Sequence, residues 1–116
     1  MELKFRALSF SGDWFYGAMN PSKEHDSHVI NLATFFANFK VSFRAETLGQ
    51  FTGLLDVNKK EIYEGDILRW AEQSSNPIGK PIWLVRYDRG SFQIPYSETT
   101  VWEVIGNIFE NEELLK

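Results

Sequence analysis

Residues 47–70 read TLGQFTGLLDVNKKEIYEGDILRW and have the pattern of a β-hairpin. Phe51 and Leu54 lead into a polar turn at residues 56–59. Strand-forming residues then bring the chain back from Ile62 to Trp70. We therefore expect this segment to fold as a unit, with the rest of the chain packing onto it.

Glycine divides the returning half of this segment. Gly65 lies between Glu64 and Asp66 and interrupts the apolar run. A glycine between two carboxylates in a strand context predicts a bulge or a sharp bend, as at a barrel corner.

The N-terminal residues alternate in polarity. Leu3, Phe5 and Ala7 are separated by charged residues, which predicts a strand with one buried face. Turn chemistry follows at residues 11–13. Residues 14–16 are aromatic and are expected to return as the second strand of a hairpin.

Residues 29–37 are ambiguous. Leu32, Phe35, Phe36 and Phe39 have the spacing of one helix face. A strand or an irregular segment is favoured, because a short isolated helix would be marginal beside β-rich neighbours. Period-two alternation then predicts a strand over residues 39–45.

The C-terminal half contains further strand signals. Alternation predicts a hairpin of residues 83–87 and 92–96, with a type I turn plus bulge at residues 88–90. Another strand is expected over residues 101–105, followed by a bend. Asn111 is placed to cap a final helical turn.

Together these signals predict an all-β fold of short-stranded, curled sheets with a short C-terminal helical turn. A chain of 116 residues fits a single domain, residues 1–116, with possible sublobes at residues 1–46 and 47–116. Aromatic residues make up 16% of the chain, which indicates a packed core. Loops around residues 18–37 and 71–81 are candidate specificity segments.

The net charge of −4 argues against non-specific duplex binding. The chain has no cysteine, so thiol chemistry is excluded and a reducing cytoplasm is the expected setting. The N-terminal residues do not resemble a signal peptide, and no apolar run is long enough to span a membrane.

Two blocks of the sequence resemble the YopX family of phage and prophage proteins. The first is GQFTGL at residues 49–54, followed by KEIYEGDI at residues 60–67. The second is EVIGNIFEN at residues 103–111. Weaker matches are KFRA at residues 4–7 and WFYG at residues 14–17.

This resemblance implies a mainly β architecture, a C-terminal half similar to SH3-like barrels, and an origin in phage or integrated phage-like DNA. It implies no particular activity. The structural motif residues that it singles out are Gly49, Gln50, Thr52, Gly53, Glu64, Gly65 and Asp66.

Two positions depart from the family pattern. Lys59 stands where the family usually has glycine after Asn58, so a left-handed turn there would cost about 1 kcal/mol. Glu112 replaces a more usual proline, and either residue suits the first position of a helix.

Candidate chemical groups are sparse. His25 and His28 with neighbouring carboxylates have metal-ligand chemistry, but a solvated loop is favoured, so no metal or cofactor is expected. Glu61, Glu64 and Asp66 have acid–base chemistry. Their favoured role is to accept backbone amides in a tight turn, so we expect no enzyme.

Aromatic side chains are the stronger candidates for binding. The candidate binding residues are Tyr63, Trp70, Trp83, Arg86, Tyr87, Tyr96 and Trp102. Most are expected in the core, but some are candidates for a surface groove. The leading hypothesis is a non-enzymatic module that binds a protein partner or its own copies. The alternative is single-stranded nucleic-acid binding through Arg69, Arg86 and Arg89 beside the aromatics.

Overall fold

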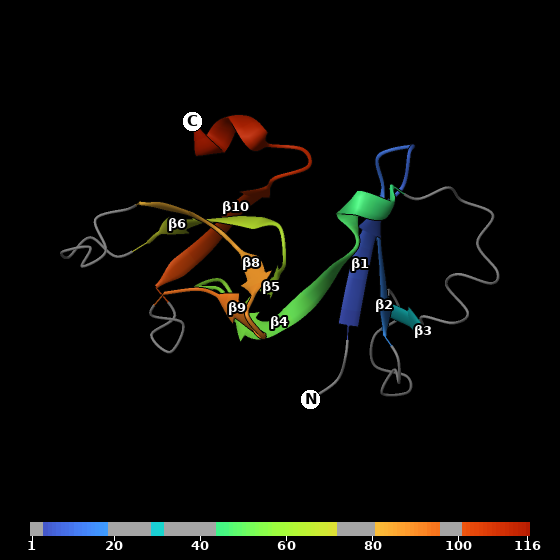
Figure 1. Ribbon diagram of the computed structural model, residues 1–116, viewed down its shortest axis with the longest axis horizontal. Coiled ribbons are helices and arrows are strands. Elements are labelled where there is room, and N and C mark those ends of the chain that lie inside the picture. The colour runs from blue at the N-terminus through green and yellow to red at the C-terminus, as the bar shows by residue number, and fades with distance from the viewer. Residues whose placement is uncertain (1–3, 19–28, 32–43, 72–80, 96–100) are drawn as a thin grey trace. The chain divides into compact units, whose positions relative to one another are not determined.

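The computed structural model describes residues 4–18, 29–31, 44–71, 81–95 and 101–116. In these ranges the chain forms strands and two short 3-10 helices, so the predicted all-β class is confirmed (Figure 1). No helix within them is long and apolar enough to cross a membrane. The strands are β1 (Lys4–Leu8), β2 (Trp14–Ala18), β3 (Val29–Asn31), β4 (Gly49–Leu55), β5 (Glu61–Tyr63), β6 (Asp66–Trp70), β7 (Ile82–Leu84), β8 (Arg86–Asp88), β9 (Ser91–Gln93) and β10 (Trp102–Asn107).

The chain groups into two compact units, Met1–Phe51 and Thr52–Lys116. One sheet has the strand order β3-β2-β1-β4-β5, and β4 contains the point where the two units meet in the sequence. The second unit also contains the sheet β10-β6-β7 and the two-stranded sheet β8-β9. The predicted single domain and its sublobes stay predictions.

The predicted N-terminal hairpin is confirmed. β1 and β2 pair antiparallel, from Lys4 opposite Ala18 to Leu8 opposite Trp14. β3 then pairs parallel to β2, which agrees with a strand at the start of the ambiguous segment. The helix-like spacing that follows β3 lies outside the described residues.

Arg6 differs from the expected alternation of β1. It was expected on the polar face, yet only 6% of it is exposed. Its guanidinium lies 4.4 Å from the ring centroid of Trp14. A cation over the face of an indole is attracted by the ring quadrupole, so an arginine can be buried there.

The predicted strand at residues 39–45 is wrong at its end, and residues 39–43 lie outside the described ranges. At Ala45, where the predicted strand should end, a 3-10 helix, η2 (Ala45–Thr47), begins instead. The backbone N–H and the hydroxyl of Thr47 both donate to Arg44 O, at 2.9 and 2.6 Å. These local bonds turn the chain before β4 begins.

Glu46 in η2 is an exposed carboxylate whose pKa is lowered. The main cause is a hydrogen bond with its own backbone N–H. The second is Arg44, whose Nε donates to Glu46 Oε2 at 3.1 Å.

A buried carboxylate organises the turn between β4 and β5. Asp56 is 1% exposed, and its Oδ1 accepts the backbone N–H groups of Asn58 and Lys60 at 2.8 and 2.9 Å. Its Oδ2 accepts the N–H of Val104 in β10 at 3.0 Å. Lys59 has a φ of 69°, so the left-handed conformation considered for this turn is present.

The sharp bend predicted at Gly65 is confirmed, with a φ of 92°. After this bend, β6 pairs with β10 and β7 instead of continuing the sheet of β4 and β5. The core of the second unit forms beside this sheet. Its buried members are Ile62, Leu68, Val85, Ile94, Val101 and Trp102.

The C-terminus ends in a 3-10 helix, η4 (Glu112–Leu115), so the predicted helical turn is confirmed. The predicted cap is wrong, because the Asn111 side chain makes no capping bond. Asn111 Oδ1 instead accepts the backbone N–H of Asn107 at 3.1 Å. The predicted SH3-like barrel stays a prediction.

Candidate functional site

The β8–β9 hairpin is the candidate site. Tyr87 pairs with Phe92, and Asp88 pairs with Ser91 across a two-residue loop. The loop residues Arg89 and Gly90 have φ values of 53° and 85°. Positive φ at both positions defines a type I′ turn, so the predicted type I turn with a bulge is wrong. Type I′ geometry matches the twist of the two strands.

The hairpin is anchored at its base. Val85 precedes β8 and is 1% exposed, and Ile94 follows β9 and is 9% exposed. Both belong to the core of the second unit. The indole N–H of Trp83 donates to Gln93 O at 2.7 Å. The hairpin is therefore held at both of its chain ends.

Gln93 also ties the two strands together. Its side-chain amide donates to Asp88 O at 3.0 Å and to Ser91 Oγ at 3.1 Å. The bond to Asp88 O joins β9 to β8, and the bond to Ser91 Oγ stays within β9. They restrain the loop at the tip of the hairpin.

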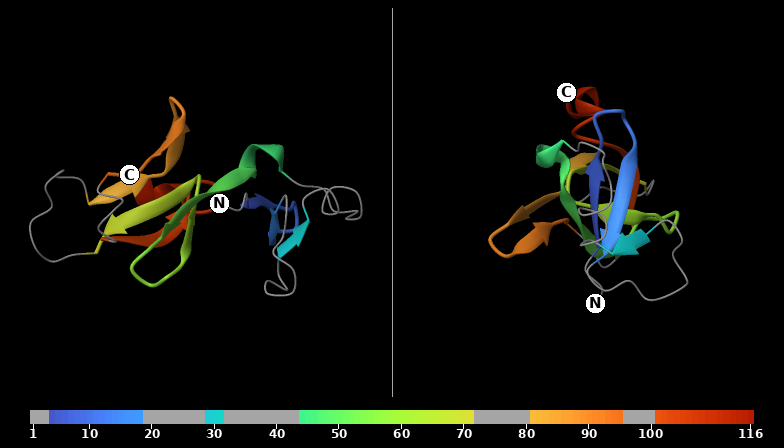
Figure 2. Two further views of the ribbon diagram at one scale, coloured as in Figure 1. Left: turned by 90° about the horizontal axis from the view of Figure 1, so that it is seen from below. Right: turned by 90° about the vertical axis from the view of Figure 1, so that its right-hand side faces the viewer.

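An aromatic pair marks one face of the hairpin. The ring centroids of Tyr87 and Phe92 are 5.0 Å apart with an interplanar angle of 73°, an edge-to-face contact. Tyr87 is 53% exposed, and Phe92 is half-buried. Figure 2 shows the hairpin in orange, extending away from the other strands of its unit. The pair therefore presents apolar surface to solvent.

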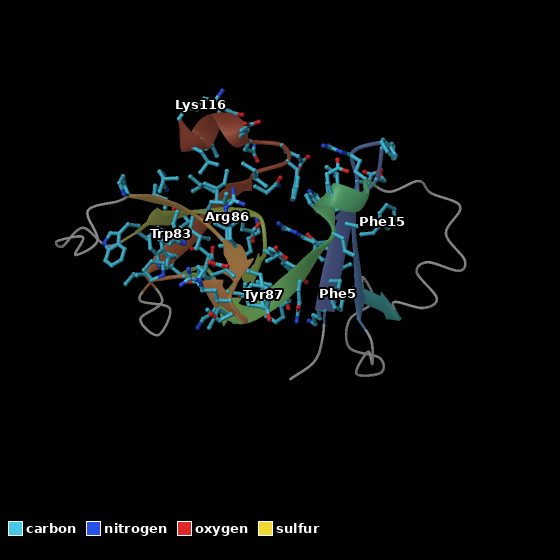
Figure 3. All side chains as sticks on the ribbon, viewed as in Figure 1. Phe5, Phe15, Trp83, Arg86, Tyr87 and Lys116 are labelled. Atoms are coloured by element: carbon cyan, nitrogen blue, oxygen red, sulfur yellow. The ribbon has the colours of Figure 1, made fainter. Side chains whose placement is uncertain are left out.

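Two cations belong to the same hairpin. Arg86 in β8 and Arg89 in the loop are exposed, and Figure 3 shows Arg86 and Tyr87 on the same hairpin. Arg69, the third arginine of the hypothesis, forms an ion pair with Glu103 between β6 and β10. The structure therefore places two of the three arginines on the hairpin.

The remaining predicted aromatics lie elsewhere. Tyr63 and Trp102 are each 2% exposed and belong to the interior. Trp70 is half-buried and meets Trp102 edge to face at 5.2 Å. Trp102 also donates its indole N–H to Pro95 O at 2.6 Å. Tyr96 lies outside the described residues.

The residues singled out by the resemblance to the YopX family lie in β4 and in the bend between β5 and β6, where they pair strands and turn the backbone. Gly49 and Gln50 pair with β1. The hydroxyl of Thr52 donates to Ile62 O at 2.8 Å, and Gly53 has a φ of 88°. Glu64 is half-buried in the bend before Gly65.

The candidate acid–base groups also take part in local structure. Asp66 is 1% exposed, and its Oδ2 accepts the N–H of Tyr63 at 2.8 Å. The phenol of Tyr63 donates to Glu61 Oε1 at 3.1 Å. Within the described ranges, no three metal-ligating side chains gather. His25 and His28 lie outside those ranges.

Phe92 was not among the predicted binding residues, although it belongs to the aromatic pair. It was assigned to a strand but not to the binding set. A two-residue loop at Arg89 and Gly90 would have placed it directly opposite Tyr87. The exposed Phe10, at 70%, was also missed, because a lone aromatic in a turn carries no periodic signal.

Comparison with known proteins identifies the family. The family model described as YopX protein matches residues 4–116. The chain belongs to the YopX family. No curated protein matches this chain. A solved structure, protein EF1440 from Enterococcus faecalis, shares its fold with this YopX family chain at 22% identity and a TM-score of 0.58. The match covers 98% of each chain.

Proposed function

We propose that this chain is a non-enzymatic contact protein that binds a protein partner or its own copies through the β8–β9 hairpin. The observation that carries the proposal is the exposed Tyr87 on an anchored hairpin. Exposed aromatics on a preordered element are typical anchors of protein interfaces.

The anchored base of the hairpin favours binding through the exposed Tyr87. Val85 and Ile94 fix the base of the hairpin in the core, and Gln93 joins its strands. Little conformational entropy is then lost when the hairpin meets a partner. Tyr87 adds a large, rigid aromatic surface with a hydroxyl at its edge. Such a side chain suits an interface that is partly apolar and partly hydrated.

The use of the buried carboxylates supports a role without catalysis. Asp56 and Asp66 accept backbone N–H groups in the turns that connect the strands. A carboxylate held in this way stabilises the turn and is not presented to a substrate. The proposed setting is a reducing cytoplasm, which the absence of cysteine supports. The proposed origin is a phage or prophage.

A second candidate function is single-stranded nucleic-acid binding at the same hairpin. Arg86 and Arg89 are exposed on the same hairpin as Tyr87, and a base can stack on an exposed tyrosine while arginines contact phosphates. The net charge of −4 opposes this function at long range. A titration of oligonucleotides at increasing salt separates the two, because phosphate contacts give a salt-dependent affinity.

The proposal predicts that Tyr87→Ala weakens association about tenfold or more, because an interface anchor loses its buried area. The matched control is Leu55→Ala, which removes a 44% exposed side chain of β4 in the same unit. Quantitative capture by immobilised protein and sedimentation of the free protein measure association with other proteins and with itself. The proposal is wrong if Tyr87→Ala and Leu55→Ala behave as the unchanged chain does in both measurements.

A further inference from the structure

The outer edge of β8 has backbone groups without a partner strand. β8 and β9 form a two-stranded sheet, and neither pairs with a further strand in the described part of the chain. The two residues beside a two-residue loop form a hydrogen-bonded pair, so the next pair, Tyr87 with Phe92, is a non-hydrogen-bonded one. The backbone N–H and C=O of Tyr87 therefore point outward from β8. Neither group bonds to another described residue.

This edge is accessible because the neighbouring segment bends away from it. Val85 lies two residues before Tyr87 on the same edge, and it bonds to the backbone of Gly65 and Asp66 at 2.9 Å each. The chain turns sharply at Gly65, and β5, before this bend, pairs with β4 and not with β8. All three residues of β8 are exposed. The open edge therefore starts just after Val85 and covers the length of β8 (Figure 2).

The charges of β8 are complementary to those of a second, antiparallel β8. Alternation places Arg86 and Asp88 on one face of the strand and Tyr87 on the other. Neither charged side chain forms an ion pair with a described residue. When two antiparallel copies of β8 meet with Tyr87 opposite Tyr87, each Arg86 lies directly opposite Asp88 of the other copy. A parallel pair in register would instead place like charges side by side, which is unfavourable.

We infer that the outer edge of β8 pairs antiparallel with β8 of a second copy of this chain. The inference rests on the proposed function, of which it names the partner and the mode of contact. Tyr87 of each copy donates its backbone N–H to the C=O of Tyr87 in the other, which joins two hairpins into one four-stranded sheet. Addition of a strand at an open sheet edge is a common mode of recognition. Because both copies use the same surface, the contact is a closed, twofold dimer.

The two faces of the joined sheet contribute differently. On one face the two Tyr87 rings lie between the two Phe92 rings, so the aromatic pair of each hairpin extends into a row of four. On the other face two exposed pairs of Arg86 with Asp88 fix the direction of pairing and contribute little affinity each. The backbone groups of Val85 are already bonded, so the pairing does not extend beyond β8. The dimer is therefore weak and depends on protein concentration.

Sedimentation velocity of the whole chain at about 0.01 M salt, over a range of protein concentrations, tests the charge pairing. The unchanged chain is expected to show a monomer–dimer equilibrium. R86D and D88R are each expected to weaken dimerisation about tenfold or more, because each places two pairs of like charges across the contact. The double variant R86D/D88R and an equal mixture of the two single variants restore opposite charges, so both are expected to dimerise. Circular dichroism confirms that each variant is folded.

Amide hydrogen exchange, followed by NMR, tests the position of the contact. The N–H of Tyr87 is expected to exchange about tenfold more slowly when the dimer dominates than when the monomer does, because it becomes hydrogen-bonded. The N–H of Phe92 is the matched control, since it points outward from β9 on the opposite edge of the same hairpin. Its exchange rate is expected to stay the same at both protein concentrations.

The inference is overturned if the unchanged chain stays monomeric, if either single variant dimerises as the unchanged chain does, or if the mixture and the double variant both stay monomeric. Exchange that slows at Phe92 and not at Tyr87 also overturns it, because the contact then lies on β9. Its failure is distinguishable from failure of the proposed function. Capture of another protein that Tyr87→Ala weakens, by a chain that stays monomeric, removes the second copy as the partner and keeps the hairpin as the contact.

Discussion

Asp56 shows how one residue connects segments that are far apart in the chain. Its carboxylate receives two N–H groups from its own turn and one from Val104 in β10. Hydrogen bonds to a charged, buried acceptor are each stronger than neutral ones. The turn and β10 are therefore fixed to each other through a single side chain.

Asp56→Asn is predicted to lower the free energy of unfolding by about 2 kcal/mol, because the amide N–H₂ would face the N–H of Val104 or of the turn. Asp56→Ala is predicted to cost about 4 kcal/mol, since all three donors lose their acceptor. Urea denaturation followed by tryptophan fluorescence measures both. The control Asp88→Asn, at an exposed position, should change stability by less than about 0.5 kcal/mol. Equal stabilities of Asp56→Asn and Asp88→Asn would contradict this role.

The sequence predicted some single residues well and others poorly. The bend at Gly65 was predictable, because the backbone freedom of glycine is a local property. The left-handed Lys59 was considered only because the family usually has glycine there, since lysine itself disfavours a positive φ. The burial of Arg6 was not, since it depends on Trp14 across the hairpin. Asn111 likewise bonds to Asn107 instead of capping the helix that follows it.

Among the elements, the bend between β5 and β6 matters most for the second unit. Gly65 has a φ of 92°, and a Cβ placed there would lie 3.0 Å from Phe109 Cε2. The backbone also joins these segments, since Ile108 N donates to Gly65 O at 2.9 Å. The bend and the turn after β10 are thus packed against each other.

Gly65→Ala and Gly90→Ala form a matched pair. Gly90 has a φ of 85° and nothing within 4 Å of an added Cβ, so its alanine variant carries only the left-handed strain, about 1 kcal/mol. Gly65→Ala carries the same strain and must also displace Phe109, which predicts an additional loss of about 1–2 kcal/mol. Thermal or urea unfolding of both variants measures the difference. Equal losses would show that the Phe109 contact is unimportant.

Most strands could be predicted from alternation, but the pairing of strands that are distant in sequence could not. The hairpins β1–β2 and β8–β9 were predictable, because a short turn brings their strands together. The pairing of β6 with β10 was not, since Trp70 and Trp102 are distant in sequence and no turn joins them. η2 was also missed, because its stabilising bonds belong to Thr47 and Arg44 and not to a hydrophobic pattern.

For the whole molecule, the described residues form a β protein, and the chain shares its fold with protein EF1440. The candidate site was only partly predictable. Tyr87 and Arg86 are exposed, whereas Tyr63 and Trp102 lie in the interior. Composition reveals many aromatics but does not show which of them the core leaves exposed. That depends on the break at Val85, which turns β8 away from β7.

The β8–β9 hairpin is the proposed place where this chain contacts another. The most direct measurement replaces Tyr87 with a photoreactive residue, Tyr87→p-benzoylphenylalanine, and compares it with Leu55→p-benzoylphenylalanine after irradiation in cells. Both positions are exposed in the same unit. We predict a discrete cross-linked species, either with another protein or between two copies, from position 87 and not from position 55. No cross-link at position 87, or the same products from both positions, would contradict the claim.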